Sequence, residues 1–272
     1  MFLLQLKVGM LMSQIKISEI PIKIIEFLSE IISISFPHQG YTSNVAIIES
    51  DRGMFALKRT RGERFHSWLK KEVSILNSLR TTDLPVPKVW EFVEENHECW
   101  ALLDYIEGET IRQVLFTEKS QEKRREIIFR FGEILSKIHS TPCPEELKTN
   151  EPWLDRMLKK AENNLTHYEV DGSRKLLERL KENKPKEFTQ TFIHGDFTID
   201  NVLVSNGVIT GIIDWAGGAY GDPRYDVSLA IRPKPNAFET ERDKLIFFEG
   251  YGQKIIDEEE YNYFANGLYE FF

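Results

Sequence analysis

The chain has 272 residues, of which 41% are hydrophobic and 29% charged, and this is enough apolar material for one large domain or two small lobes. Its formal net charge of -8 argues against the Lys- and Arg-rich surface that binds nucleic acids. Two cysteines are too few for a disulfide framework or a zinc site, so we expect a reducing, cytoplasmic setting.

The apolar opening MFLLQLKVGMLM is short and is interrupted by Lys7, so it predicts neither a signal peptide nor a membrane span. The sequence is compatible with a translation start at Met1, Met10 or Met12. We therefore expect a soluble protein with no nucleic acid and no membrane among its partners. The pattern gives no oligomeric state.

The first hundred residues predict a sheet with one prominent helix. In chain order, the expected elements are a short helix, a strand, a hairpin, a longer helix and two strands, at 18–28, 31–36, 45–58, 65–80, 89–95 and 99–105. The two prolines of LPVPKV end the longer helix. A turn-rich segment containing Gly40, Thr42 and Ser43 separates the first strand from the hairpin.

The hairpin has SDRG as its turn, which pairs Glu49 with Met54 and Lys58 with Val45. The Lys58 ammonium is then expected beside the turn-rich segment, whose backbone amides could contact an anion. Glu72 follows the apolar spacing of the longer helix, and a buried carboxylate needs a partner. These positions predict a pair between Lys58 and Glu72; the alternative is an exposed lysine and a glutamate at the rim of the helix.

After the segment IEGET, the pattern changes to long helical periods at 121–139, 152–166 and 173–183, and a further helix pair closes the chain. This change predicts an α+β protein with two lobes. The first is an antiparallel-sheet lobe of residues 13–105, and the second is a mainly helical lobe of residues 106–272.

The stretch FIHGDFTIDNVLV places His194, Asp196, Asp200 and Asn201 between two apolar runs. Buried polar groups of this kind need partners or a function. The Asn-Gly pair at 206–207 follows directly and is a strong signal for a hairpin turn.

Counting outward from that turn pairs Asn201 with Ile212, and it places Asp214 on the same face as Asn201. With Asp196 close by in sequence, these groups form an all-oxygen site that suits magnesium, which completes its shell with water and phosphate. The alternative is that the same residues only cap the hairpin and its loop.

No G-x-x-x-x-G-K-[ST] loop occurs in the chain, which excludes a P-loop as the source of nucleotide binding. The segments HGDFTIDN and GIIDW, the lysine of FALK, Glu72 and LLDYIEGE nevertheless follow the order found in aminoglycoside phosphotransferases and their kinase-like relatives. The chain resembles that family from about Ile31 to its end. HGDFTIDN also resembles the kinase catalytic loop H-R-D-x-x-x-x-N, with Gly in place of Arg.

The resemblance implies a two-lobed protein-kinase-like fold and transfer of the γ-phosphate of ATP, with Mg2+, to a hydroxyl of a small molecule. It assigns proton acceptance to Asp196, magnesium binding to Asn201 and Asp214, and phosphate contacts to Lys58 braced by Glu72. The remaining implied roles are adenine or phosphate binding and structural support, the former by Gly40, Thr42, Ser43, Asp104, Tyr105 and Ile106, and the latter by His194 and Asp226.

The ending LYEFF resembles the ends of kanamycin-type kinases, which implies acceptor contacts from Glu270 and from the Phe272 carboxylate, and Arg232 is counted with them. Two departures remove acidic residues that such kinases carry, because Tyr269 replaces one and Pro233, after Arg232, replaces another. An aminoglycoside is the expected acceptor.

Three alternatives stay open. The first is a kinase of a metabolite alcohol of the choline, homoserine, methylthioribose or fructosamine type. The second is an inactive nucleotide-binding pseudokinase, which the intact Lys58, Asp196, Asn201 and Asp214 disfavour. The third is a protein kinase, which the lack of an A-P-E-like segment after IDW disfavours. The sequence does not distinguish ATP from GTP.

Overall fold

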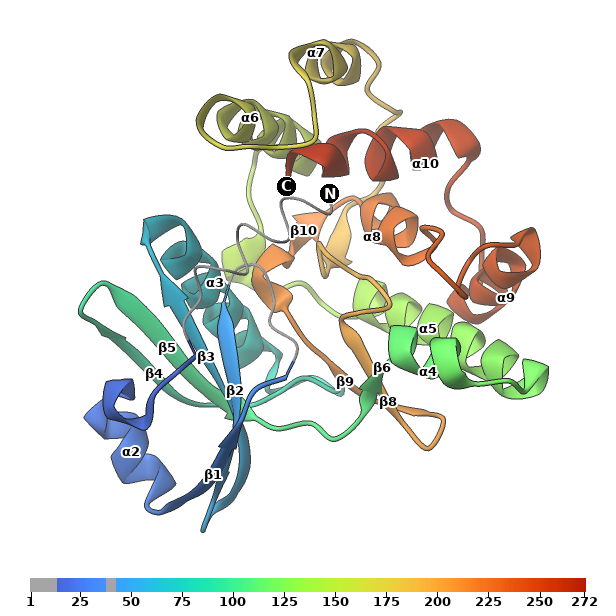
Figure 1. Ribbon diagram of the computed structural model, residues 1–272. Helices are drawn as coiled ribbons and strands as arrows, with labels where there is room; N and C mark the ends of the chain where they lie inside the picture. The colour runs from blue at the N-terminus through green and yellow to red at the C-terminus, as the bar shows by residue number, and fades with distance from the viewer. Residues whose placement is uncertain (1–13, 38–42) are drawn as a thin grey trace. The chain divides into compact units, whose positions relative to one another are not determined.

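The computed structural model describes residues 14–37 and 43–272 (Figure 1). Gly40 and Thr42, two of the predicted phosphate-binding residues, lie outside these described residues. The described chain forms two compact units. The first holds the residues up to Thr81 together with Val86–Ile106, and the second holds Thr82–Pro85 and Glu107–Phe272.

The first unit is built on a five-stranded antiparallel sheet in the order β1-β2-β3-β5-β4. Two α-helices and a 3-10 helix accompany the sheet among the described residues. The elements are η1 Ile17–Glu19, α2 Ile22–Leu28, β1 Ile31–Ser35, β2 Asn44–Ser50, β3 Gly53–Arg61, α3 Glu63–Leu79, β4 Val89–Glu95 and β5 Glu98–Asp104.

Alternation along β3 determines which side chains face which helix. Phe55 and Leu57 join a core cluster with Ile24 and Leu28 of α2. Lys58 directly follows Leu57 in the strand, so its side chain points to the other side of the sheet, where α3 packs. The predicted hairpin register, including the pairing of Lys58 with Val45, is confirmed.

The second unit is mainly helical and contains two small sheets, in the orders β6-β8-β9 and β10-β7. Its elements are β6 Glu109–Thr110, α4 Ile111–Thr117, α5 Gln121–Ser140, η2 Glu145–Leu147, α6 Trp153–His167, α7 Arg174–Glu182, β7 Thr191–Ile193, β8 Val202–Ser205, β9 Val208–Ile212, η3 Trp215–Gly217, β10 Ala219–Gly221, α8 Pro223–Ala230, α9 Glu241–Tyr251, α10 Glu258–Ala265 and η4 Leu268–Phe271. The predicted helices at 121–139, 152–166 and 173–183 are confirmed as α5, α6 and α7.

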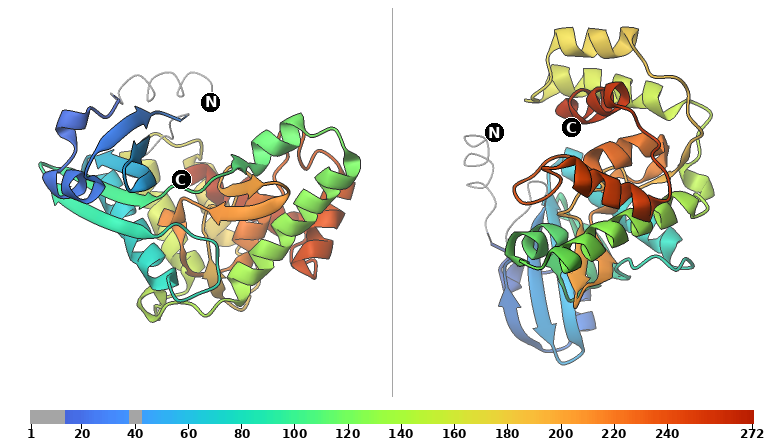
Figure 2. Two further views of the ribbon diagram at one scale, coloured as in Figure 1. Left: turned by 90° about the horizontal axis from the view of Figure 1, so that it is seen from below. Right: turned by 90° about the vertical axis from the view of Figure 1, so that its right-hand side faces the viewer.

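Helices α5 and α9 lie side by side and form the main helix contact of this unit (Figures 1 and 2). Glycine permits the close approach: a Cβ on Gly132 would lie 2.1 Å from the carbonyl oxygen of Phe247, and one on Gly250 would lie 1.9 Å from that of Phe129. Real Cβ atoms do not come so near to backbone oxygens, so larger residues at either position would push the helices apart.

The second hairpin differs from its predicted register by one residue. Ser205 pairs with Val208 as expected, but Thr210 is an extra residue on β9, and Val202 rather than Asn201 pairs with Ile212. A β-bulge of this type adds one residue to one strand and shifts everything beyond it. Asn201 lies opposite Ile213 instead, since its carbonyl oxygen accepts the Ile213 N–H at 3.0 Å.

Short helices α4 and α8 were not predicted from the sequence. α8 begins at the Asp222-Pro223 pair, in which the Asp222 carboxylate caps the helix and Pro223 occupies its first turn. Among the helices that the structure describes, none is both long and apolar enough to cross a membrane.

Candidate active site

In the first unit, Lys58 and Glu72 form a buried ion pair. The Lys58 Nζ lies 2.7 Å from Glu72 Oε1, and the two residues are 7% and 5% exposed. The place of Lys58 on β3 directs its side chain toward α3, and Glu72, in the third turn of α3, lies opposite Lys58. In a pair so poorly hydrated, each charge compensates the other.

Two other predicted residues of this unit have clear places in the structure. Ser43 is half-buried and directly precedes β2. Asp104, at the end of β5, accepts hydrogen bonds from the Lys88 N–H at 3.0 Å and from Trp90 Nε1 at 2.6 Å. This carboxylate therefore ties β5 to β4.

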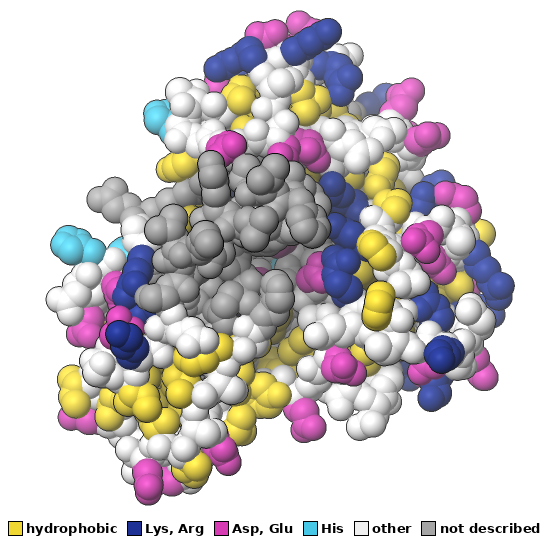
Figure 3. Space-filling view, in the orientation of Figure 1, with side chains coloured by type: hydrophobic (Ala, Val, Ile, Leu, Met, Phe, Trp, Pro, Cys, Tyr) yellow, Lys and Arg dark blue, Asp and Glu magenta, His cyan; other side chains and the backbone are white. Residues whose placement is uncertain are grey.

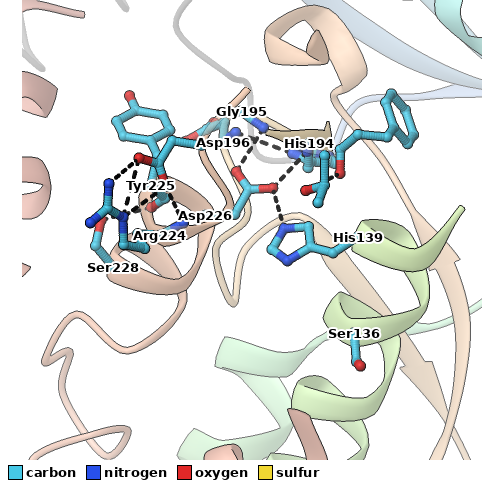
Figure 4. A network of polar contacts seen from close by, with 12 residues as sticks. Ser136, His139, His194, Gly195, Asp196, Arg224, Tyr225, Asp226 and Ser228 are labelled. Carbon is cyan, nitrogen blue, oxygen red and sulfur yellow. Dashed lines mark hydrogen bonds and ion pairs between the residues drawn. The ribbon is translucent and has the colours of Figure 1, made fainter. Parts of the chain in front are cut away.

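In the second unit, the segment between β7 and β8 contains the polar residues of HGDFTIDN, and Asp226 of α8 holds its backbone (Figure 4). One Asp226 oxygen accepts the His194 N–H at 2.6 Å, and the other accepts the Gly195 N–H at 2.8 Å. His139, from α5, brings its Nε2 to 3.4 Å from the same carboxylate. Asp226 is fully buried, so these contacts fix the start of the loop.

His194 links the two segments of the site. Its Nδ1 accepts the Asp196 N–H at 3.2 Å, and its Nε2 lies 3.0 Å from the carbonyl oxygen of Ile213. A ring that accepts at Nδ1 and donates at Nε2 is neutral. With both nitrogens engaged and the ring fully buried, His194 supports the loop and is not placed to act as an acid or a base.

Asn201 and Asp196 lie in direct contact. The Asn201 Nδ2 donates to the Asp196 carbonyl oxygen at 2.8 Å and to Asp196 Oδ2 at 3.1 Å. Because the amide nitrogen is used in this way, the Asn201 Oδ1 is the atom left to meet a cation. The hydrogen bond from the Ile213 N–H to the Asn201 carbonyl oxygen brings the next residue, Asp214, close to Asn201.

Gly195 and Asp214 adopt backbone conformations in the left-handed region, with φ of 78° and 63°. A Cβ on Gly195 would lie 2.3 Å from the Gly217 carbonyl oxygen, so only glycine permits this approach of the two segments. Asp214 is not a glycine, and its αL conformation costs energy that the surrounding contacts must offset. Backbone strain at this position is typical of a functional site.

Burial first, and then the nearby Asp214 carboxylate, raise the pKa of Asp196 to about 7, against the opposite effect of hydrogen bonds from Asn201 and Tyr269. A dication held by Asp214 and Asn201 would relieve the repulsion between the Asp196 and Asp214 carboxylates. Among the described residues, no three His, Cys, Asp or Glu side chains are grouped to hold a metal. The donor set that fits a cation is therefore small, the Asp214 carboxylate and the Asn201 amide oxygen, and it suits an ion that takes its other ligands from phosphate and water.

The C-terminal residues approach Asp196 from a second side. The Tyr269 hydroxyl donates to Asp196 Oδ1 at 3.4 Å, and the Arg232 guanidinium stacks 4.7 Å from the Tyr269 ring centroid. Arg232 also lies 3.6 Å from a Glu270 carboxylate oxygen. Phe272 remains 36% exposed at the end of the chain.

Sequence reasoning missed the contribution of Tyr269, which it treated only as the loss of an acidic residue. It also missed Arg112, whose Nη2 donates to Asp200 Oδ2 at 2.6 Å and whose Nε donates to the other oxygen. The two residues are 88 positions apart, so no local pattern indicates the pair.

These features define a kinase-like phosphotransferase fold: a five-stranded antiparallel sheet that carries a Lys–Glu pair, and a helical unit that carries an Asp-x-x-x-x-Asn loop followed by an aspartate. A family model described as "Phosphotransferase enzyme family" matches residues 33–262. The chain belongs to this family, and the predictions of a kinase-like α+β fold and of a small-molecule phosphotransferase are confirmed.

Two relatives and two solved structures illustrate the likeness. An aminoglycoside 3'-phosphotransferase of Niallia circulans is 27% identical over 244 residues, which cover 86% of this chain and 90% of the relative. A homoserine kinase of Neisseria meningitidis is 26% identical over 151 residues, which cover 50% of this chain and 47% of the relative.

Among solved structures, an aminoglycoside-3'-phosphotransferase of type VIII superposes with a TM-score of 0.71 at 19% identity and covers 89% of this chain and 93% of its own. A streptomycin–ATP ternary complex of another aminoglycoside phosphotransferase gives a TM-score of 0.68 at 17% identity and covers 93% of this chain and 87% of its own. At these identities the likeness concerns the fold.

Proposed function

We propose that the protein transfers the γ-phosphate of ATP, with Mg2+, to a hydroxyl group of a small molecule. The observation that carries the proposal is the assembly of Asp196 and Asn201, on a loop held by His194 and Asp226, with Asp214, which follows β9. Phosphoryl transfer needs alignment and charge neutralisation more than covalent help from the protein, and these groups supply both.

Asp196 is the proton acceptor in this proposal. The proton of the acceptor hydroxyl passes to the Asp196 carboxylate as the hydroxyl oxygen bonds to the γ-phosphorus. The bond from phosphorus to the β,γ-bridging oxygen breaks, and ADP leaves. In the metal-free protein the pKa of Asp196 is raised to about 7, so this carboxylate takes up a proton more readily than an exposed aspartate does.

Asn201 and Asp214 are proposed to hold the magnesium ion through the amide oxygen and the carboxylate. When bound, Mg2+ supplies positive charge that neutralises the phosphate oxygens. The raised pKa of Asp196 beside Asp214 supports the assignment, because it reflects an excess of negative charge, which attracts a cation.

The nucleotide contacts are proposed for residues of the lobe of residues 13–105. Lys58, held by Glu72, is proposed to contact the α- and β-phosphates. The further nucleotide contacts are proposed for Gly40, Thr42, Ser43 and for the backbone of Asp104, Tyr105 and Ile106. The streptomycin–ATP complex of a relative with this fold supports ATP as the donor. A cytoplasmic location is part of the same proposal.

Two classes of acceptor are supported by relatives. The aminoglycoside predicted from the sequence is supported by the Niallia circulans relative. A metabolite alcohol is supported by the homoserine kinase relative. A pseudokinase is disfavoured because Lys58, Asp196 and Asn201 are present with formed contacts.

A release assay for ADP tests the proposal. The purified protein is incubated with ATP, or with GTP, and with aminoglycosides or metabolite alcohols, with magnesium or with EDTA. We expect acceptor-stimulated ADP release only with magnesium. Release that proceeds equally in EDTA, or that no acceptor of either class stimulates, would remove the proposed function.

A further inference from the structure

Positively charged side chains gather beside the catalytic loop of the second unit. They belong to Arg112 at the start of α4, and to Arg232 and Lys234 after α8. Figure 3 shows a group of Lys and Arg side chains near the position of α8 in Figure 1. A cationic group so close to the proton acceptor bears on the charge of the molecule that binds there.

Arg112 is held in a fixed orientation. Its backbone N–H donates to the Ile199 carbonyl oxygen at 3.0 Å, and its guanidinium forms a two-pronged pair with Asp200. The pair raises the pKa of Arg112, chiefly through the hydrogen bond to Asp200. The Asp200 carboxylate is consequently neutralised and offers little attraction to an incoming amine.

Arg232 is connected to the catalytic carboxylate through one side chain. It stacks on Tyr269, and the Tyr269 hydroxyl donates to Asp196. Its pair with Glu270 is long, at 3.6 Å, and the guanidinium side chain is 24% exposed. Arg232 therefore both neutralises Glu270 and keeps donors available for an oxyanion.

Lys234 adds an ammonium next to these groups. Among the residues that the structure describes, its Nζ forms no ion pair. Burial lowers the pKa of Lys234, and Arg232 and Arg112 lower it further, while Asp200 and Asp196 act in the opposite direction. Lys234 follows Arg232 by two residues, and an anion bound beside these cations would relieve the repulsion between them.

The charges on this side of the loop do not suit a polycation. Asp200 and Glu270 are already paired with arginines, and the proposed function uses Asp196 and Asp214 for the proton and the metal. An acceptor with several amines would have to bind against Arg232 and Lys234, and like charges brought together disfavour binding.

We infer that Arg232 and Lys234, with Arg112 behind them, form an acceptor subsite for an oxyanion. The acceptor is a small alcohol that also carries a carboxylate or a phosphate ester, and its hydroxyl is directed at Asp196 while its anionic group meets the cations. The inference rests on the proposed function for the hydroxyl, but binding of the oxyanion is separable from transfer.

Matched acid and amide probes test the subsite. The probes are 4-hydroxybutyrate with 4-hydroxybutanamide, and L-homoserine with its amide; glycerol 3-phosphate and glycerol separate phosphate from carboxylate, and kanamycin serves as the polycation. Lys234→Gln is the main variant, because Lys234 forms no ion pair within the described chain whose loss would unfold the protein. Lys159→Gln is the control, because Lys159 is 74% exposed on α6 and pairs only with Glu151.

Binding is read first, by calorimetry with magnesium and a non-hydrolysable ATP analogue. We expect at least one acid or phosphate ester to bind about tenfold more tightly than its uncharged partner, a difference worth about 1.4 kcal/mol. Lys234→Gln should remove the preference, whereas Lys159→Gln should keep it and neither should alter the affinity for the nucleotide analogue. Arg232→Gln should weaken the same preference.

Three results would overturn the subsite. Amides and glycerol binding as well as their charged partners would do so, and so would kanamycin binding more tightly than every acid. A loss of nucleotide affinity in Lys234→Gln would assign the lysine to ATP instead. These results are distinct from failure of the proposed function, in which the wild type binds the acids selectively but shows no magnesium-dependent ADP release with any of them.

Discussion

Replacing Lys58 with methionine separates the structural role of the Lys58–Glu72 pair from its proposed role with the nucleotide. The two side chains are 7% and 5% exposed and 2.7 Å apart. Lys58→Met leaves the Glu72 carboxylate buried without the ammonium, and breaking a buried pair in this way costs about 3 to 5 kcal/mol. The double variant Lys58→Met/Glu72→Met removes both charges and should regain most of that stability.

The assay has two readouts. Urea unfolding followed by tryptophan fluorescence gives the stability of each variant, and calorimetry gives its affinity for magnesium-ATP. The control is Lys70→Met, because Lys70 and Glu94 form a pair of similar length, 2.6 Å, with side chains 50% and 45% exposed. Exposed pairs contribute about 0 to 1 kcal/mol, so this variant should unfold nearly as the wild type does.

Two results would refute the reasoning. If Lys58→Met unfolds at the same urea concentration as Lys70→Met, the pair is hydrated in solution and contributes no more than a surface pair. If the stable double variant binds magnesium-ATP as tightly as the wild type, Lys58 has no part in nucleotide binding, whatever its contribution to the fold.

Three further predictions follow from the second unit. The folded pKa of Asp196 is raised from 3.8 to about 7, so the metal-free protein should lose stability as pH rises from about 4 to 7 and this carboxyl ionises. The full shift corresponds to a loss of about 4 kcal/mol in the free energy of unfolding, and residual hydration reduces this loss to about 1 to 2 kcal/mol. Asp196→Asn in EDTA should therefore melt above the wild type at pH 8 but not at pH 4, and equal melting temperatures at both pH values would contradict the shift. Asp226→Asn replaces one of two carboxylate acceptors with an amide N–H that faces a backbone N–H, so it should cost about 2 to 3 kcal/mol in urea unfolding; a loss below about 0.5 kcal/mol would mean that the loop does not depend on it. Deleting Phe272 alone should leave the melting temperature nearly unchanged, whereas deleting the fully buried Phe271 as well should cost about 3 to 5 kcal/mol, and identical effects of the two truncations would be inconsistent with their different burial.

Local patterns in the sequence were sufficient to predict the first hairpin and the burial of Glu72. The turn SDRG determines a register in which Lys58 faces α3, and helical spacing places Glu72 on the inward face of that helix. Both inferences use distances of a few residues along the chain, over which strand and helix geometry are regular. The same reasoning placed Asn201 opposite Ile212, and that register is wrong by one residue.

What the sequence did not predict depends on irregular or distant contacts. The bulge at Thr210 shifts the second hairpin by one residue, and the Thr210 hydroxyl donates to the Glu107 carbonyl oxygen at 2.8 Å, far away in sequence. The contact of Tyr269 with Asp196 and the pair of Arg112 with Asp200 likewise join segments 73 and 88 residues apart. Patterns of period two or 3.6 carry no information on such pairs.

Transfer of label from [γ-32P]ATP to an acceptor is the most direct test of the central claim that Asp196, Asn201 and Asp214 form a magnesium-dependent phosphotransfer site. The wild type, Asp196→Asn and Asp214→Asn are compared with magnesium and with EDTA. We predict transfer by the wild type only with magnesium, binding of magnesium-ATP but transfer slowed by roughly 10² to 10⁴-fold in Asp196→Asn, and loss of magnesium-dependent nucleotide binding in Asp214→Asn. Transfer at the wild-type rate by Asp196→Asn, or by the wild type in EDTA, would contradict the claim.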